Sequence, residues 1–463
     1  MINFKDKLVL VIGLGETGLS MVRWLTSQGA RLRVADSRAV PPGLSDVLQY
    51  IDNNEIICGD LTDAVFESID LIALSPGVPL YEPAIARAVA RGIPVAGDIE
   101  LFAQQLATSH SPLTSKVLAI TGSNGKTTVT SLVAHLCCAC GLDAVAAGNI
   151  SPAVLDVVLQ RGANQPAVWV LELSSFQLET LSSLKADAAT VLNVSEDHLD
   201  RYTGMDGYAA AKQRIFTGSR VQIVNRDDAR SQSMKNPEQE FISFGLNEPE
   251  RDVDYGIARE ANDIWLVQGN QRLIKACELQ LAGLHNVANA LAALALCRSI
   301  DLPMPALLDA LRNFKGLPHR VEKIAEKYGV TFYDDSKGTN VGATVAALEG
   351  LGCKAVLIAG GVGKEQDFSP LNAAVKQHAR AVVLIGRDAP LIEAALQGCD
   401  VPVIHAVDMH DAVQQAARLA QSGDAVLLSP ACASFDMFKN YAHRAEVFIA
   451  AVHQLIAEGA WRP

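Results

Sequence analysis

Short runs of β-branched residues alternate with longer Ala- and Leu-rich stretches of helical periodicity along almost the whole chain. This alternation is typical of parallel strands joined by crossover helices, so the sequence predicts an α/β fold. A chain of 463 residues is long enough for about three domains. The first block contains the expected strands Leu8–Ile12, Arg31–Ala35, Ile69–Leu74 and Ile93–Val95.

Two stretches interrupt the alternation and predict boundaries: the polar segment Thr108–Ser115 and the turn-rich segment Phe314–His319. Between them, we expect a section poor in strands that extends to Lys275, followed by a helix over Asn286–Ser299. The expected strands of the middle and last blocks are Val117–Ile120, Val168–Leu173, Ala189–Val194, Val221–Val224, Val330–Tyr333, Ala355–Ala359, Ala381–Ile385 and Ala425–Leu428.

Composition excludes several classes of protein. Lys and Arg number 39 against 51 Asp and Glu, a net charge of −12, which argues against binding to a nucleic-acid backbone. The apolar runs are far shorter than the ~18 residues of a membrane helix, and no export signal is evident. Nine cysteines are too sparse for a disulfide scaffold. We therefore expect a reduced, cytoplasmic protein that binds no nucleic acid and has no membrane span.

The loop Gly13–Gly18 follows the first expected strand and matches the pattern G-x-G-x-x-G. Glycines permit a tight turn there, and the following helix offers backbone N–H groups to a diphosphate. Taken alone, this loop predicts a dinucleotide-dependent dehydrogenase, with Asp36 on a ribose hydroxyl and Arg38 nearby. The alternative is a glycine turn that only packs a strand against a helix.

A second loop, Thr121–Thr128, connects the strand Val117–Ile120 to an expected helix over Val129–Cys140. Its backbone N–H groups can surround phosphate oxygens, Lys126 can reach the terminal phosphates, and the Thr127 hydroxyl can bind magnesium. The usual phosphate-loop spacing would need glycine in place of Ile120, so this is a shortened form. An inert turn is the alternative.

Polar residues follow two further strands of the middle block, namely Glu172–Ser175 and Ser195–His198. The carboxyl ends of neighbouring parallel strands meet in one crevice, so Glu172 and His198 could hold a second cation beside the phosphate loop. Each could equally be a cap or a hydrogen-bonded core residue. Glu196 and Asp197 could also be acids in the first turn of a helix.

Three segments of the last block follow expected strands: Asp335–Asn340, Gly360–Lys364 and Ser429–Asp436. A glycine-rich loop ending in lysine, together with a serine-rich helix start, suits a ligand that carries a carboxylate. Each segment alone is equally compatible with ordinary loop chemistry. Cys432 could be a nucleophile, but no histidine partner is identifiable, and a buried free cysteine is the alternative.

Taken together, these motifs resemble the Mur ligases of bacterial cell-wall synthesis, and within them the D-glutamate-adding branch. The resemblance covers essentially the whole chain. It implies an N-terminal Rossmann-like domain over 1–97 that binds a UDP-sugar, a central P-loop ATPase domain over 98–316, and a C-terminal Rossmann-like amino-acid domain over 317–463. Its most specific pieces are Thr121–Thr128, Leu171–Leu178, Asn193–Tyr202, Gly283–Asn286, Leu317–Arg320, Asp335–Asn340 and Ser429–Asn440.

The resemblance implies an ATP-dependent amide ligase that joins D-glutamate to UDP-N-acetylmuramoyl-L-alanine, acting as a monomer with two Mg²⁺ ions. Its catalytic residues would be Lys126, His198, Lys212 and Arg320. ATP would contact Gly122, Ser123, Asn124, Gly125, Lys126, Thr127, Thr128, Asn286, Asn289, Arg320 and Asp335. The UDP-sugar would contact Gly15, Glu16, Thr17, Asp36, Ser37, Arg38, Ser75 and Asn149. D-Glutamate would contact Lys337, Thr339, Lys364, Ser434, Phe435 and Tyr441. Magnesium would be held by Thr127, Glu172, His198 and Lys212, the last carrying a carbamate.

The chain departs from this family pattern at two positions. Val362 stands where an aspartate is expected, which predicts a looser hold on Lys364, and Ser151 stands where a glycine is expected. Three other readings stay open at this point: a related ligase with another acceptor, such as a sister Mur ligase or a folylpolyglutamate synthase, a nucleotide-binding sensor without catalysis, and a dehydrogenase.

Overall fold

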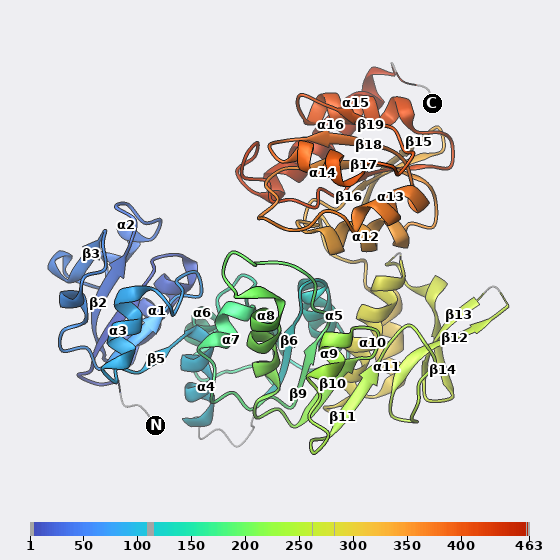
Figure 1. The fold of residues 1–463 in the computed structure, drawn as a ribbon. Helices are drawn as coiled ribbons and strands as arrows, with labels where there is room; N and C mark the ends of the chain where they lie inside the picture. Colours follow the sequence, from blue (N-terminus) through green and yellow to red (C-terminus); the bar gives the residue numbers. More distant parts are fainter. Residues whose placement is uncertain (1–3, 109–114, 262, 282, 460, 462–463) are drawn as a thin grey trace.

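The computed structural model describes residues 4–108, 115–261, 263–281, 283–459 and 461, and these form three α/β units, each built on its own sheet (Figure 1). The first sheet has five parallel strands in the order β3-β2-β1-β4-β5. Its buried apolar strands are joined by the helices α1 (Glu16–Ser27) and α3 (Pro83–Ala90). The strands are β1 (Leu8–Ile12), β2 (Arg31–Asp36), β3 (Ile56–Cys58), β4 (Leu71–Leu74) and β5 (Val95–Ala96).

The middle sheet has nine strands in the order β14-β13-β12-β11-β10-β9-β6-β8-β7. The expected strand-poor section before Lys275 is wrong, because four of these strands lie in it. They expose a polar face, on which Arg272 and Lys275 cover the ring of Trp265, so their composition does not stand out as apolar. The strands are β6 (Lys116–Thr121), β7 (Ala144–Gly148), β8 (Val168–Glu172), β9 (Ala188–Val191), β10 (Val221–Asn225), β11 (Phe241–Phe244), β12 (Tyr255–Glu260), β13 (Asp263–Gln268) and β14 (Gln271–Lys275).

Helices α5 (Lys126–Ala139) and α10 (Leu284–Arg298) pack against each other beside this sheet. Ten residues of α10 are buried, as expected for a helix whose apolar residues occupy nearly every side. Helix α5 begins directly after the loop that follows β6. The sequence therefore predicts both helices, with boundaries displaced by a few residues.

The third sheet has the order β15-β16-β20-β17-β18-β19, with only β15 antiparallel to its neighbour. The helix start expected within Ser429–Asp436 is wrong: the backbone there continues as a loop that pairs Ala433 with Val362. Helix α16 begins at Tyr441, where the Asn440 side chain accepts the His443 N–H. The other elements are β15 (Glu322–Lys327), β16 (Val330–Asp334), α12 (Val341–Gly350), β17 (Ala355–Gly360), α13 (Leu371–His378), β18 (Ala379–Ile385), α14 (Ala389–Ala395), β19 (Val403–His405), α15 (Met409–Leu419) and β20 (Ala425–Leu428).

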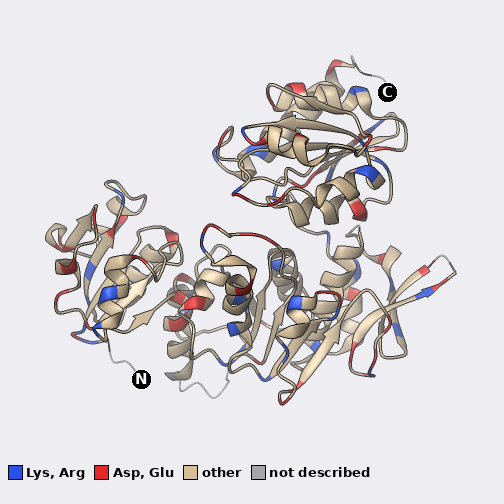
Figure 2. Cartoon of the chain, in the orientation of Figure 1, with Lys and Arg blue, Asp and Glu red and all other residues tan. Residues whose placement is uncertain are grey.

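Helix α12 lies on the side of the C-terminal unit that faces the middle unit (Figure 1). Acidic and basic residues are interspersed over all three units (Figure 2). Among the described residues, no helix is long and apolar enough to cross a bilayer. The domain boundaries at 97/98 and 316/317 stay predictions, and residues 109–114 of the predicted linker lie outside the described part of the chain.

The packing of α4 (Asp98–Thr108) on the middle sheet generates a stability prediction. Phe102 is fully buried, and its ring meets that of Trp169 edge-on at 4.8 Å. The Phe102→Ala substitution would leave a cavity there, and we expect it to lower the free energy of unfolding by about 3–5 kcal/mol. Urea unfolding followed by tryptophan fluorescence would measure this. Leu391→Ala, which removes a largely exposed side chain, is the control and should change the free energy little.

Candidate functional site

The loop Gly13–Gly18 needs its first and last glycines. Gly13 has φ +91°, and a Cβ there would lie 2.9 Å from the Cβ of Ser75, while a Cβ on Gly18 would lie 1.8 Å from the Gly13 carbonyl oxygen. The loop borders a cavity of about 210 Å³ shared by the first and middle units. Five of the predicted UDP-sugar residues line this cavity: Gly15, Glu16, Thr17, Ser75 and Asn149. Gln177, to which the sequence assigned no role, lines it as well.

The remaining UDP-sugar residues lie at the end of β2. Asp36 is buried and accepts hydrogen bonds from the Leu14 N–H at 2.7 Å and from the Arg38 side chain at 2.6 and 2.8 Å. Although burial opposes ionisation, these donors hold the pKa of Asp36 at about 2. Asp36 therefore orients Arg38, which is about half exposed with Ser37 beside it.

The middle sheet brings the predicted nucleotide residues together at the carboxyl ends of its strands. Pairing of Ile120 with Glu172 and of Thr121 with Val191 places β6, β8 and β9 in one register. The phosphate loop thus lies between Glu172 and the segment that carries His198. A Cβ on Gly125, which has φ +82°, would lie 2.7 Å from the Asn289 Oδ1, so α10 contributes this asparagine to the same place.

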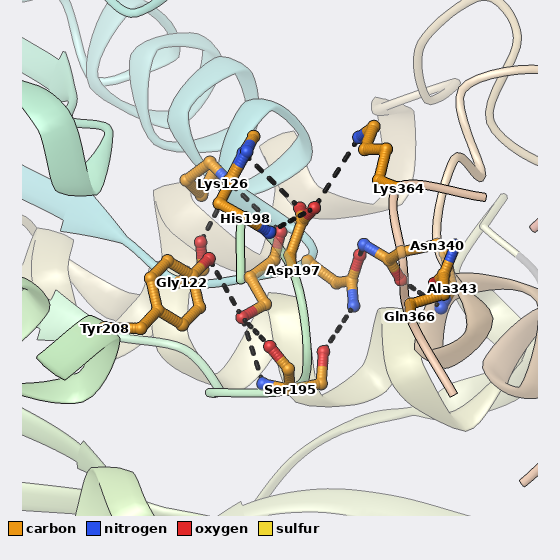
Figure 3. Close-up of polar contacts among 12 residues, drawn as sticks. Gly122, Lys126, Ser195, Asp197, His198, Tyr208, Asn340, Ala343, Lys364 and Gln366 are labelled. Carbon is orange, nitrogen blue, oxygen red and sulfur yellow. Dashed lines mark hydrogen bonds and ion pairs between the residues drawn. The ribbon is translucent and has the colours of Figure 1, made fainter. Parts of the chain in front are cut away.

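Two lysines converge on one carbonyl of the phosphate loop. Lys126 Nζ donates to the Gly122 oxygen at 2.8 Å (Figure 3). Lys212 Nζ donates to the same oxygen at 2.9 Å. Lys212 is 1% exposed. Burial lowers the pKa of Lys126, and burial reinforced by the charge of Lys126 lowers the pKa of Lys212 well below its usual range. The Lys212 amine is therefore readily neutral.

Glu172 fits a role as a cation ligand. It is 2% exposed, its Oε1 accepts the Asn149 amide at 2.8 Å, and its buried Oε2 has no partner among the described residues. A buried carboxylate oxygen without a partner is costly, and a hard cation such as Mg²⁺ would satisfy it. Thr127, in the first turn of α5, supplies a hydroxyl oxygen of the type that binds Mg²⁺.

His198 has φ +55° and packs edge-on against Phe176 at 4.8 Å. Its Nε2 lies 3.6 Å from Asp197 Oδ2, and Asp197 Oδ1 lies 3.5 Å from Lys364 Nζ of the C-terminal unit. Burial lowers the pKa of His198, which keeps its ring neutral and able to bind a metal. Asp197 lies ahead of α8 (Gly204–Gln213), so the helix-turn interpretation of Asp197 and Glu196 is wrong.

The third sheet also gathers its predicted residues at one edge, since the loops after β16, β17 and β20 are neighbours. Lys337 Nζ lies 3.7 Å from the centre of the Tyr441 ring. Burial and the nearby Arg320 lower the pKa of Lys337 to about 8. Ser434 is buried and Thr339 half-buried, whereas Phe435 is 74% exposed.

Arg320 and Asp335 face each other where the two units meet. Asp335 Oδ2 accepts the Ser429 hydroxyl at 2.7 Å, and burial raises the pKa of Asp335 to about 7 despite the attraction of Arg320. Burial lowers the pKa of Arg320. Asn286 is buried on the first turn of α10. Lysines, an arginine and carboxylates from both units thus surround one crevice.

Three family models match the chain in succession. The N-terminal domain of MurD-like Mur ligases matches residues 7–97, the Mur ligase middle domain matches 120–297, and the glutamate ligase domain of Mur ligases matches 319–432. Together they span most of the chain and fall in the order of the three sheets.

Full-length relatives share more than half of the sequence. A UDP-N-acetylmuramoylalanine--D-glutamate ligase from Nitrosomonas europaea is 55% identical, with 97% of each chain covered. One of the same name from Aromatoleum aromaticum is 58% identical, again over 97% of each chain. Among solved structures, a pseudomurein peptide ligase type C from Methanothermus fervidus has a TM-score of 0.60 at 18% identity, covering 97% of this chain and 100% of its own. At this low identity, the similarity shows a shared fold.

The buried carboxyl group of Asp98, which contacts Gln177, leads to a prediction about how the free energy of unfolding depends on pH. Asp98 is 1% exposed, its Oδ2 accepts the Gln177 amide at 3.0 Å, and burial raises its pKa to about 6. The folded chain therefore keeps a proton that the unfolded chain releases above pH 4, so this group lowers stability as pH rises from 4 to 6. Relative to Asp98→Asn, the free energy of unfolding of the wild type should fall by about 3 kcal/mol across that window.

Urea unfolding at several pH values would measure this difference. The exposed Asp52→Asn substitution is the control and should keep a constant difference from the wild type. A constant difference for Asp98→Asn as well would contradict the assigned ionisation.

Proposed function

Because the chain belongs to the Mur ligase family, we propose that its crevice joins D-glutamate to UDP-N-acetylmuramoyl-L-alanine at the expense of ATP. The observation that carries this proposal is the hydrogen bond from Asn149 to Glu172. Asn149 lines the first cavity, and Glu172 lies beside the phosphate loop. A UDP-sugar held in that cavity would extend its terminal carboxylate toward the terminal phosphate of ATP.

Joining a carboxylate to an amine needs an activated acyl group. The alanyl carboxylate would attack the terminal phosphorus of ATP, releasing ADP and forming an acyl phosphate. The D-glutamate nitrogen would then attack the acyl carbon, and the tetrahedral intermediate would release inorganic phosphate and a proton to give the amide. The chain must therefore bring three anions together and stabilise further negative charge in the transition states.

Lys126 would supply the first of these stabilising contacts. Its ammonium group now donates to carbonyls of Gly122 and Ser123 in its own loop, and it would exchange them for phosphate oxygens. Arg320 would meet the terminal phosphate, and each such oriented donor is worth roughly 3 kcal/mol. Asn286, Asn289 and Asp335 would face the nucleoside.

The donor set fits two magnesium ions. Thr127 and the unpartnered oxygen of Glu172 would hold one, and His198 with a modified Lys212 would hold the other. Bound there, the ions would neutralise the phosphate oxygens and polarise the phosphoryl and acyl groups. The chain's own contribution is to bring the Glu172 carboxyl and the His198 ring into the same crevice, where burial lowers the pKa of His198 and favours its neutral form.

We also propose that Lys212 carries a carbamate. A neutral amine can add carbon dioxide with loss of a proton, which gives a metal-binding anion, and burial shifts the Lys212 amine toward its neutral form. Lys212 is not a surface lysine, since it is 1% exposed.

D-Glutamate would bind at the edge of the third sheet. Lys337, Thr339, Lys364 and Ser434 offer donors for its two carboxylates, with Tyr441 packed on Lys337 and Phe435 at the open side. We propose that the protein acts as a monomer, as the family resemblance implies. We place the reaction in the cytoplasm, where ATP is available.

The direct test is a coupled assay with purified protein. ADP and a peptide product that contains D-glutamate should form only when ATP, Mg²⁺, UDP-N-acetylmuramoyl-L-alanine and D-glutamate are all present. ADP formation that does not depend on D-glutamate, or that another amino acid supports better, would contradict the proposed acceptor.

Replacing Lys212 tests the metal-ligand role. Lys212→Ala should lower kcat at least ~100-fold, because an oriented electrostatic contact in the transition state is lost. Calorimetry should find the affinity for the UDP-sugar within about twofold of wild type. Lys376→Ala, which changes an exposed lysine in the last turn of another helix, is the matched control. Normal turnover of Lys212→Ala would refute the role.

A further inference from the structure

A hydrogen bond between two side-chain amides crosses from the phosphate loop to the C-terminal unit. Asn340 Nδ2 donates to Asn124 Oδ1 at 3.0 Å (Figure 3). The other end of the same amide is also occupied, because Asn340 Oδ1 accepts the Ala343 N–H at 2.9 Å and caps α12. Asn340 is 4% exposed. It cannot turn without leaving a buried polar atom unpaired, which fixes its orientation.

A third side-chain amide, that of Gln366, extends this series of hydrogen bonds inside the C-terminal unit. Gln366 Oε1 accepts the Val341 N–H at 2.9 Å, and its Nε2 donates to the carbonyls of Gly363 and Ala431, both at 2.8 Å. These three bonds reach three different loops. They are the loops that carry Lys337 and Thr339, Lys364, and Ser434, so one side chain fixes the spacing of the predicted D-glutamate residues.

The loop held by Gln366 has a shape that needs external support. Lys364 and Glu365 have φ +53° and +59°, a left-handed conformation that residues other than glycine rarely adopt. Gln366 holds the backbone on one side of these residues, through the Gly363 carbonyl. The ion pair of Lys364 with Asp197 orients the side chain from the other.

The two units also approach closely beside Asn340. A Cβ on Gly342 would lie 3.1 Å from the Ser195 Oγ and 3.3 Å from the Asn124 Nδ2. The first turn of α12 therefore packs directly on the phosphate loop and its neighbour. Asn124 is fixed on its own side as well, since its Nδ2 donates to the Ser195 Oγ at 3.2 Å.

We propose that Asn340 and Gln366 are positioning residues that set the amino-acid loops against the phosphate loop. This inference rests on the proposed function and adds to it the means by which the attacking nitrogen is brought within reach of the acyl group. Neither residue is among those predicted to touch a substrate. Attack requires the reacting atoms to be about 3–3.5 Å apart, so a small displacement of these loops costs rate.

The Asn340→Ser substitution separates the two functions of this side chain. Serine is as good a helix cap as asparagine, but its hydroxyl is too short to reach Asn124. With ATP and UDP-substrate saturating, KM for D-glutamate should rise about 5- to 10-fold, the range expected for one hydrogen bond. KM for the UDP-substrate and the thermal unfolding temperature should stay near wild type. Asn440→Ser, at an exposed cap of α16 without this contact, is the matched control.

Gly342→Ala tests the same contact by a different change. Alanine favours the helix more than glycine does, so the unfolding temperature should not fall, yet its methyl group would separate α12 from Ser195. KM for D-glutamate should again rise while KM for the UDP-substrate stays constant.

Gln366→Met removes the three loop contacts at nearly constant volume and should raise KM for D-glutamate in the same way, whereas Gln397→Met on the surface should not. Because Asn340 and Gln366 act in one connected series of contacts, the double variant should raise KM for D-glutamate by less than the product of the two single fold-changes. An unchanged KM for D-glutamate in Asn340→Ser and Gly342→Ala would overturn the inference. Wild-type ADP formation that does not depend on D-glutamate would instead overturn the proposed function.

Discussion

The Gly122 carbonyl accepts hydrogen bonds from the side-chain nitrogens of two lysines, Lys126 and Lys212, and the chemistry of the crevice depends on this close approach. Two like charges within hydrogen-bond distance of one oxygen repel each other, and burial adds to the cost of keeping both ionised. Lys212 responds with a pKa far below that of a free lysine. Burial lowers the pKa of Lys126 as well, and the charges of Glu172 and Asp197 oppose this shift at both lysines. The site thus favours the neutral form of a lysine more than water does, and the charge of Lys126 adds to this effect at Lys212.

The strand order explains why these groups meet. Glu172 ends β8, the phosphate loop follows β6, and the His198 segment follows β9, so three adjacent parallel strands deliver the metal and phosphate groups to one edge. The third sheet delivers Asp335, Lys364 and Ser434 in the same manner. Neither unit holds all of the proposed residues, because the proposed phosphate-loop and metal residues belong to the middle unit and the proposed D-glutamate residues to the C-terminal unit. The proposed site therefore includes the contact between these two units.

Much of this arrangement could be predicted from the sequence. The glycines of the two loops, the apolar strands before them and the polar residues after them are local signals, and they place Lys126 and Glu172 correctly in one crevice. Asp197, Gln177 and Asn340 lie in segments that the sequence singles out, but the sequence assigned them no role in the site, and Gln366 lies outside those segments. Their importance comes from partners far away in the chain, such as Lys364 for Asp197, and single residue types carry no record of those partners. The strands before Lys275 were missed for another reason, since buried and exposed residues are mixed in them and polar residues interrupt their apolar runs.

The two departures from the family pattern differ in which part of the residue makes the contacts: the backbone at Val362 and the side chain at Ser151. The sequence predicts that Val362 loosens the hold on Lys364. In the structure, however, Val362 pairs with Ala433 through its own N–H and carbonyl at 2.8 and 2.9 Å, and the next N–H donates to Asp388 at 2.7 Å. Backbone bonds hold the loop whichever side chain stands at 362. At Ser151 the reverse applies, because its hydroxyl donates to Glu16 at 2.8 Å in the cavity between the first and middle units. A glycine could not make that contact, so this second departure adds a bond between the first and middle units.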